Sequence, residues 1–308
     1  MMTRQGAVQE KRFEGKGKRL LEPKGEKVRG DGVDIFLAVW EGRGKNLLAV
    51  HGLTANCRCW NPIAGALTPR HRLSAMDLRG RGRSDKPASG YSIDIHAGDI
   101  LALLDHLGMK EVVLLGHSLG AFISLVFAAR NPSRVSRLVL VDGGGKLSAE
   151  QTARVFAGIK TSLERLGKTF PSFEAYVGIL RKAPFLQPWS EALENYFRYE
   201  VEEVPAGVRP RIRPEAIQEE IMNLTRMDVS LFYSQVQCPV LILRATEGVL
   251  YSDDILLPED VVGRMVREIP GAKRVDVEGT NHYSILFQDN PARDRAILQF
   301  LDEDDESG

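Results

Sequence analysis

Apolar runs alternate with segments of helical spacing over the first half of this chain. Between residues 27 and 142, five short aliphatic runs read as strands, at 35–40, 46–50, 72–77, 111–116 and 135–142. Several of these runs are apolar on both faces, which is typical of strands in the interior of a parallel sheet. Residues 94–107 and 121–130 have helical spacing and lie between the strands. This alternation indicates crossover connections and a largely parallel sheet.

The pattern changes at residue 146. From there to residue 237 the sequence shows no convincing strand, only amphipathic helical stretches at 150–166, 173–180, 191–201 and 214–227. The alternation then resumes, with strands at 240–244 and 273–277 and helices at 258–268 and 291–301. We therefore predict an α/β core of residues 27–145 and 238–302, interrupted by an all-helical cap at 146–237. Such an insert would cover the carboxyl ends of the strands, where open α/β sheets bind their ligands.

The charge balance and the two ends of the chain limit the classes of partner that we expect. The 308 residues carry 41 Lys plus Arg and 41 Asp plus Glu, so no net field attracts nucleic acid or an anionic membrane. Residues 1–26 form a basic lead, expected to be extended or partly ordered, and residues 303–308 form an acidic tail. The three cysteines, at 57, 59 and 238, fit no disulfide framework, and no apolar run approaches the length of a membrane span. We expect a cytoplasmic protein.

A nucleophilic serine is predicted where the strand at 111–116 ends. The chain reads Gly116-His117-Ser118-Leu119-Gly120 and then continues as a helix. A sharp turn from strand to helix exposes a serine hydroxyl and crowds the backbone, so glycines are needed on both sides of the serine. Taken alone, the same pattern also fits a glycine-rich turn after a buried strand.

A second feature follows the strand at 46–50. Gly52 there allows the Leu53 N–H to point at an oxyanion that develops on a substrate, and the Leu119 N–H is the second expected donor. The plain alternative is a turn that ends the strand. The polar loop at 77–85 lacks the full glycine fingerprint of a dinucleotide site, and we expect it to shape a pocket wall.

His282 is the best candidate for the base that accepts the serine proton. It follows the strand at 273–277 and is the one histidine on the C-terminal side of Ser118. His117 and His51 compete for this role. The side chain of His117 should diverge from its neighbour on the tight turn, and His51 is expected to organise its loop through hydrogen bonds.

These landmarks together resemble the α/β-hydrolase family over residues 27–302. The matching residues are His51-Gly52, the Asp77-x-Arg79-Gly80-x-Gly82-x-Ser84 loop, the Gly116–Gly120 turn, and Asn281-His282 followed by Asn290-Pro291. The resemblance implies a mostly parallel eight-stranded sheet flanked by helices. It also implies that Ser118 is the nucleophile, that His282 is the base, and that the N–H groups of Leu53 and Leu119 form the oxyanion hole.

The acid that should orient His282 is where the sequence departs from this family. Family members commonly carry an aspartate a few residues past the strand that corresponds to 240–244, and here that position holds Gly248. Glu247 lies one residue earlier and is our first choice. Asp142 ends the strand after the serine turn, the other location that the family uses, and is the second. Asp254 and Asp253 follow.

The resemblance implies acyl chemistry without a cofactor. A serine nucleophile argues against epoxide and haloalkane hydrolysis, which need a carboxylate. The cap is rich in aromatic residues such as Phe156 and Trp189, which favours a small to medium hydrophobic ester. We expect a carboxylesterase-like serine hydrolase whose partner is a small-molecule ester, with no metal, nucleic acid or membrane. The alternatives are a lactonase, a hydrolase of carbon–carbon bonds in vinylogous diketones, and a non-catalytic receptor.

Overall fold

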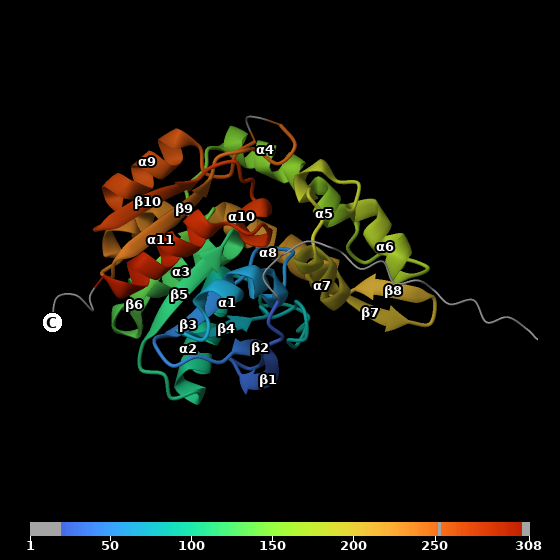
Figure 1. Cartoon of the computed structure of the whole chain (residues 1–308), viewed down its shortest axis with the longest axis horizontal. Helices are drawn as coiled ribbons and strands as arrows, with labels where there is room; N and C mark the ends of the chain where they lie inside the picture. Colours follow the sequence, from blue (N-terminus) through green and yellow to red (C-terminus); the bar gives the residue numbers. More distant parts are fainter. Residues whose placement is uncertain (1–19, 252–253, 304–308) are drawn as a thin grey trace, which may run out of the picture.

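The computed structural model describes residues 20–251 and 254–303. Eight strands form one sheet in the order β1-β2-β4-β3-β5-β6-β9-β10 (Figure 1). Their bounds are β1 Lys24–Arg29, β2 Asp34–Trp40, β3 Asn46–Val50, β4 Arg72–Met76, β5 Val112–His117, β6 Val135–Val141, β9 Val240–Ala245 and β10 Ala272–Val277. Neighbours from β4 to β10 pair in parallel, whereas β2 is antiparallel to both β1 and β4. The predicted eight-stranded, mostly parallel sheet is confirmed.

Helices cover both faces of this sheet, because successive residues of a strand point to opposite sides. In β3, Leu48 and Val50 belong to the apolar cluster on one face, and Leu47 and Ala49 to the cluster on the other. The first cluster includes residues from α2 Ile93–His106, α3 Leu119–Arg130 and α9 Glu259–Glu268. The second includes residues from α1 Asn61–Leu67, α10 Ser284–Phe287 and α11 Pro291–Asp302. Short 3-10 helices lie at Cys57–Trp60, Pro132–Arg134, Pro184–Leu186 and Val229–Gln235.

Strand β1 begins inside the stretch 1–26 that the sequence places in the basic lead, and it continues to Arg29. Five of its six residues are exposed and only Val28 is buried, so it carries no apolar alternation that would mark it as a strand. Its backbone pairs antiparallel with β2 from Lys24 to Arg29. The lead therefore ends before Lys24. Residues 1–19 and 304–308 lie outside the described part of the chain.

The chain leaves the sheet between the neighbouring strands β6 and β9, and residues 146–237 of this connection are called the insert below. Its helices are α4 Ala149–Gly158, α5 Lys160–Glu164, α6 Phe173–Leu180, α7 Glu191–Glu200 and α8 Pro214–Arg226. In Figure 1, α4, α5 and α6 follow one another from the top of the molecule down its right side, and α7 lies beside the sheet. The insert contacts the core: its 3-10 helix Val229–Gln235 lies against α3, and α7 lies against the 3-10 helix Cys57–Trp60.

The prediction that this insert is all helical is wrong. Strands β7 Val201–Val204 and β8 Gly207–Pro210 form an antiparallel hairpin within it. The turn places Gly207 at a φ of 128°, which favours glycine. The predicted helix at 150–166 is also divided in two at Ile159. Both differences arise in short, partly exposed segments, where periodicity is a weak signal.

Within residues 20–251 and 254–303, no helix combines the length and apolar character that crossing a bilayer requires. The predicted cytoplasmic location stays a prediction.

Candidate active site

Ser118 occupies a strained turn between β5 and α3. Its φ of 54° and ψ of −120° lie in a region that residues with a side chain rarely adopt. The glycines on either side make this turn possible. A Cβ on Gly116 would lie 2.3 Å from the Gly120 carbonyl oxygen, and a Cβ on Gly120 would lie 2.1 Å from the Val50 carbonyl oxygen. The crowding predicted for a serine turn is therefore present.

His282 is held by a buried carboxylate. Its Nδ1–H donates to Asp142 Oδ2 over 2.8 Å, and both side chains are buried. The other carboxylate oxygen, Oδ1, accepts the Ala245 N–H at 3.2 Å, so both oxygens of Asp142 have partners. Because Nδ1 carries the proton in this bond, Nε2 of the neutral ring is left as the acceptor. A histidine held in this way is able to take a proton from a hydroxyl.

The carboxylate that contacts His282 is that of Asp142, the second choice from the sequence, and not that of Glu247, the first choice. The Glu247 side chain is exposed, and its backbone N–H donates to the Thr280 carbonyl over 2.9 Å. The carboxylate of Asp254 accepts the N–H groups of Val249 and Leu250 instead, at 2.6 and 2.8 Å. Asp253 lies outside the described residues.

Asp142 reaches His282 because it ends β6. This strand pairs with β5 on one side and with β9 on the other, so its carboxyl end lies between the serine turn and the loop after β9. Asp142 itself has a positive φ of 44°, unusual for an aspartate. Such local strain is concentrated at functional sites.

The peptide between Gly52 and Leu53 has a fixed orientation. The Gly52 carbonyl accepts two hydrogen bonds, from His51 Nδ1–H at 2.8 Å and from the Ala55 N–H at 3.2 Å. In a trans peptide the N–H points opposite to the C=O, so the Leu53 N–H points away from these two donors. A Cβ on Gly52 would lie 3.0 Å from the Cβ of Ser118, which shows how closely this loop approaches the serine.

Leu119, the second predicted donor, is the first residue of α3. The first N–H groups of a helix have no partner within the helix, and they carry the positive end of its dipole. Leu53, Leu119, Ser118 and His282 all line one cavity. Leu53 and Leu119 thus lie at the same cavity as Ser118, and the role of their N–H groups as oxyanion donors stays a prediction.

Two further histidines are buried beside the site, and burial keeps both of them neutral. Burial lowers the pKa of His51 to about 4, and its Nε2 accepts the Leu78 N–H at 3.0 Å. His51 therefore organises its loop, as the sequence predicts. Burial also lowers the pKa of His117 well below the usual value, and its interaction with the neighbouring His282 lowers it further.

Sequence reasoning missed the contact between His117 and His282. The two rings stack with centroids 4.5 Å apart, and His117 Nε2–H donates to the His282 carbonyl over 3.0 Å. His117 thus holds both the ring and the backbone of the predicted base. Its position next to Ser118 was the one available signal, and it did not indicate a contact with residue 282.

The cavity beside Ser118 has a volume of about 600 Å³ and an apolar lining. The core contributes Leu53, Leu119 and Phe122, whereas most other side chains come from the insert, namely Leu147, Val155, Phe156, Ile159, Leu224 and Met227. Lys146 also lines the cavity, and its ammonium lies 3.9 Å from Asp228 Oδ1. Trp189, another aromatic residue of the insert, instead stacks on Phe197 with centroids 5.6 Å apart.

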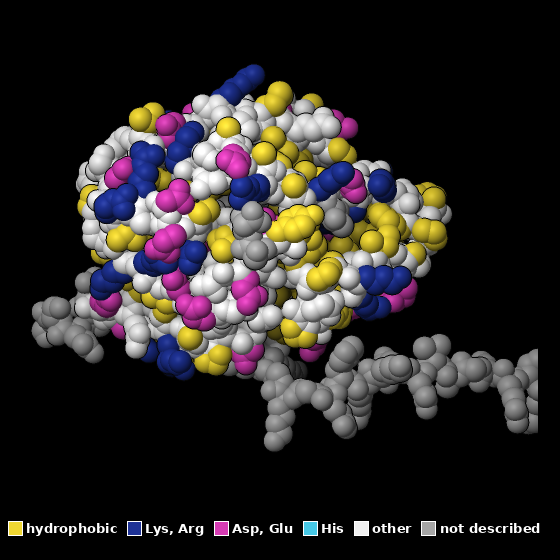
Figure 2. All heavy atoms as spheres, turned by 90° about the horizontal axis from the view of Figure 1, so that it is seen from above, with side chains coloured by type: hydrophobic (Ala, Val, Ile, Leu, Met, Phe, Trp, Pro, Cys, Tyr) yellow, Lys and Arg dark blue, Asp and Glu magenta, His cyan; other side chains and the backbone are white. Residues whose placement is uncertain are grey.

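The surface above the insert is also apolar in part. Seen from above, hydrophobic side chains gather toward the centre and right of the molecule, over the insert, and charged side chains are denser on the left (Figure 2).

Among the residues that the structure describes, no group of three or more His, Cys, Asp or Glu side chains is placed to hold a metal ion.

Comparisons with known proteins give the family. A family model described as alpha/beta hydrolase fold matches residues 45–289. A 2-(acetamidomethylene)succinate hydrolase of Mesorhizobium japonicum is 32% identical over 248 residues, which is 79% of this chain and 83% of that protein. A putative carbamate hydrolase RutD of Caulobacter segnis is 27% identical and covers 88% of this chain and 97% of its own length.

The fold of a solved structure is also similar. A crystal structure of an E-2-(acetamidomethylene)succinate hydrolase matches with a TM-score of 0.78 at 26% identity, over 91% of this chain and 99% of that one. The sheet order, the strained serine turn and these matches agree, and the chain belongs to the α/β-hydrolase fold family.

Proposed function

We propose that this protein is a serine hydrolase that cleaves carboxylic esters of small to medium hydrophobic substrates through an acyl-enzyme on Ser118. One observation carries the proposal. Ser118, on its strained turn, opens into the same apolar cavity as His282, whose Nδ1–H is bound by the buried Asp142. In this proposal Asp142 replaces Glu247 as the acid.

The reaction would proceed in two halves. In the first, His282 Nε2 takes the Ser118 proton while the serine oxygen forms a bond to the ester carbonyl carbon. The N–H groups of Leu53 and Leu119 bind the resulting oxyanion, which collapses as the C–O bond to the alcohol breaks and His282 protonates the alcohol. In the second half, His282 takes a proton from a water molecule while the water oxygen attacks the acyl carbon. The bond between that carbon and the Ser118 oxygen then breaks, His282 returns the proton to Ser118, and the acid is released.

The cavity lining supports an uncharged, apolar acyl or alcohol group. Eight aliphatic or aromatic side chains of the insert line the space beside Ser118, the six named above together with Ala149 and Val229, and a volume of about 600 Å³ accommodates a small to medium ligand. Among the described residues that line it, Lys146 is the one lysine or arginine. Burying a charged substrate there would lack compensating partners.

The relatives favour a second candidate, hydrolysis of a carbon–nitrogen bond in an amide or a carbamate. The same serine chemistry serves both bonds, except that the leaving nitrogen must be protonated before it departs. A substrate with two carboxylates, such as a succinate, calls for more cationic partners than Lys146 alone. The polarity of the cavity therefore ranks the ester above this candidate.

A matched substrate pair tests the ranking. Esters and N-alkyl amides with the same butanoyl or octanoyl group are compared by kcat/KM, together with an alkyl carbamate and a lactone. We expect the esters to be hydrolysed at about 10⁴ M⁻¹ s⁻¹ or faster, and Ser118→Ala to abolish this activity. An amide or carbamate that is cleaved faster than its matched ester would contradict the proposal, and so would ester hydrolysis that survives Ser118→Ala.

A further inference from the structure

A buried arginine connects the loop of Leu53 to the insert. Arg81 lies in the loop after β4, and its Nε–H donates to the Leu53 carbonyl over 3.1 Å. Its Nη1–H donates to the Arg79 carbonyl at 3.1 Å, and its Nη2 forms an ion pair with Glu220. Glu220 belongs to α8 of the insert. One guanidinium therefore contacts both the predicted oxyanion loop and a helix of the insert.

The network is fully buried and charged. Arg81 and His96 are 0% exposed and Glu220 is 1% exposed, and His96 Nε2 lies 2.7 Å from Glu220 Oε1. Burial alone would raise the pKa of Glu220, but Arg81 and His96 lower it to about 2, so the carboxylate is ionised. A buried ion pair contributes little net stability compared with apolar residues of similar size. Stability is thus a weak reason for charged side chains at this position.

The hydrogen bond from Arg81 to the Leu53 carbonyl connects this network to the predicted oxyanion hole. The peptide before Leu53 is fixed by His51 and Ala55 through the Gly52 carbonyl, and the peptide after it is fixed by Arg81. Both peptide planes next to the Leu53 Cα are therefore held, which sets the direction of its N–H. Glu220 in turn holds the fork of Arg81, because a guanidinium keeps one orientation when each of its edges has a partner.

We propose that Glu220 is a positioning residue: through its ion pair with Arg81 it aligns the Leu53 N–H with the oxyanion. The rate of the chemical step then depends on how α8 is docked on the core. The inference rests on the proposed function, since it assigns a reaction-dependent role to Leu53. Glu220 would act on the reaction without touching the substrate, because it contacts Arg81 and His96 and is not among the residues that line the cavity with Ser118.

Helix α8 has other anchors, which makes the proposal testable. Glu219 Oε1 accepts the N–H groups of Gly90 and Tyr91, at 3.0 and 2.9 Å. The side-chain amide of Asn223 donates to the Tyr91 carbonyl over 2.7 Å. These bonds do not involve Glu220, so neutralising Glu220 should leave α8 docked.

The test compares Glu220→Gln with Glu200→Gln. Glu200 is a matched control, because it is 1% exposed and its carboxylate is paired with Arg165 and Tyr176, both within the insert. We expect Glu220→Gln to lower kcat about 10- to 100-fold with KM nearly unchanged, as expected when an oxyanion donor is misaligned. Affinity for a trifluoromethyl ketone, which forms an oxyanion on the serine, should fall by the same factor. Glu220→Asp should recover part of both losses, and Glu200→Gln should change neither.

A second measurement does not depend on ester hydrolysis. Hydrogen exchange of the peptide covering residues 51–60 should quicken in Glu220→Gln and not in Glu200→Gln. Arg81→Lys, which keeps the charge but loses the fork, should reproduce the effect if Glu220→Gln fails to fold. Unchanged exchange and unchanged kcat in folded Glu220→Gln would overturn the inference, as would an equal effect of Glu200→Gln. If the wild-type protein hydrolyses no ester but exchange responds as stated, the proposed function fails and the coupling of α8 to the loop stands.

Discussion

At the scale of single residues, the account depends on which carboxylate serves His282. Asp142 is buried and bound to Nδ1, whereas Glu247 is exposed and its backbone is bonded to Thr280. Both are acids at the ends of neighbouring strands. Only the residue whose carboxylate meets the imidazole can fix its tautomer and stabilise the imidazolium.

Asp142→Asn should therefore lower kcat for a p-nitrophenyl ester by about 10³- to 10⁴-fold, because the amide would favour the wrong histidine tautomer. Glu247→Gln is the matched control and should remain within about twofold of wild type, as expected for an exposed side chain. A collapse of kcat in Glu247→Gln together with an active Asp142→Asn would reverse the assignment.

The glycines of the serine turn allow a second test at this scale. Gly120→Ala would bring a methyl group within 2.1 Å of the Val50 carbonyl oxygen, so we expect the free energy of unfolding to fall by about 2 kcal/mol or more, with loss of activity. Gly65→Ala in α1 is the control, since no heavy atom lies within 4 Å of its added Cβ. It should leave activity intact and alter stability by less than about 1 kcal/mol, in the stabilising direction. Urea unfolding measures the stability of the two variants, and ester hydrolysis measures their activity. Equal losses of stability and activity in Gly120→Ala and Gly65→Ala would refute the steric explanation.

At the scale of elements, the insert determines the shape of the cavity. Helix α4 contributes Val155 and Phe156 to the lining, while Ala157 of the same helix is exposed. The core supplies Ser118 and His282. Under the proposed function, the core would supply the chemistry and the insert most of the contacts that select the substrate, as is common where one fold serves many reactions.

Val155→Trp should shorten the acyl group that the enzyme accepts. The larger side chain fills part of the cavity, so kcat/KM for an octanoyl ester should drop at least about tenfold relative to the acetyl ester. Ala157→Trp places the same side chain on the outer side of α4 and should leave the ratio unchanged. A ratio that is unaffected by Val155→Trp would mean that the acyl chain does not bind against α4.

The elements differ in how well the sequence predicted them. Strands such as β3 and β5 are apolar on both faces and are followed by glycine turns, so composition and spacing were sufficient. Strand β1 is largely exposed, the strands β7 and β8 have only four residues each, and the pairing of all three depends on neighbours that a local pattern does not contain. The same limit applied to the site. The serine turn is encoded within five adjacent residues, but the partner of His282 lies 140 residues away, where sheet order decided the outcome.

At the scale of the whole molecule, buried neutral histidines make stability depend on pH. The pKa of His51 is about 4 in the folded protein and about 6.5 when the chain is unfolded. The unfolded state therefore binds the proton first on acidification. The stability that His51 contributes is fully present above pH 6.5 and is lost as pH falls from 6.5 to 4, by about 3 kcal/mol in total.

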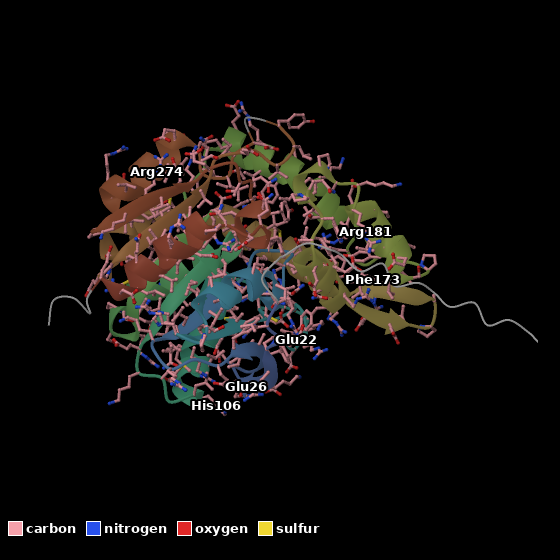
Figure 3. All side chains as sticks on the ribbon, viewed as in Figure 1. Glu22, Glu26, His106, Phe173, Arg181 and Arg274 are labelled. Atoms are coloured by element: carbon pink, nitrogen blue, oxygen red, sulfur yellow. The ribbon has the colours of Figure 1, made fainter. Side chains whose placement is uncertain are left out.

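The free energy of unfolding of wild type should accordingly fall between pH 6.5 and pH 4. His51→Asn removes the titrating group, so this variant should show a shallower decline. His106 is exposed and lies at the outer edge of the molecule (Figure 3), and His106→Asn should follow the wild-type slope. Urea titrations at several pH values give the slopes. A wild-type slope retained in His51→Asn would show that the loss comes from other groups.

The most direct test of the central claim is covalent trapping of the nucleophile. A fluorophosphonate transfers its phosphonyl group to an activated serine oxygen and releases fluoride, and intact-mass analysis followed by peptide mapping locates the group. We predict one phosphonyl group per chain, on Ser118, with no labelling of Ser118→Ala or of unfolded protein, and labelling at least about 10³-fold slower in Asp142→Asn. Labelling at a different residue, or no labelling of the folded wild-type protein, would contradict the assignment of Ser118, His282 and Asp142 as the reacting group.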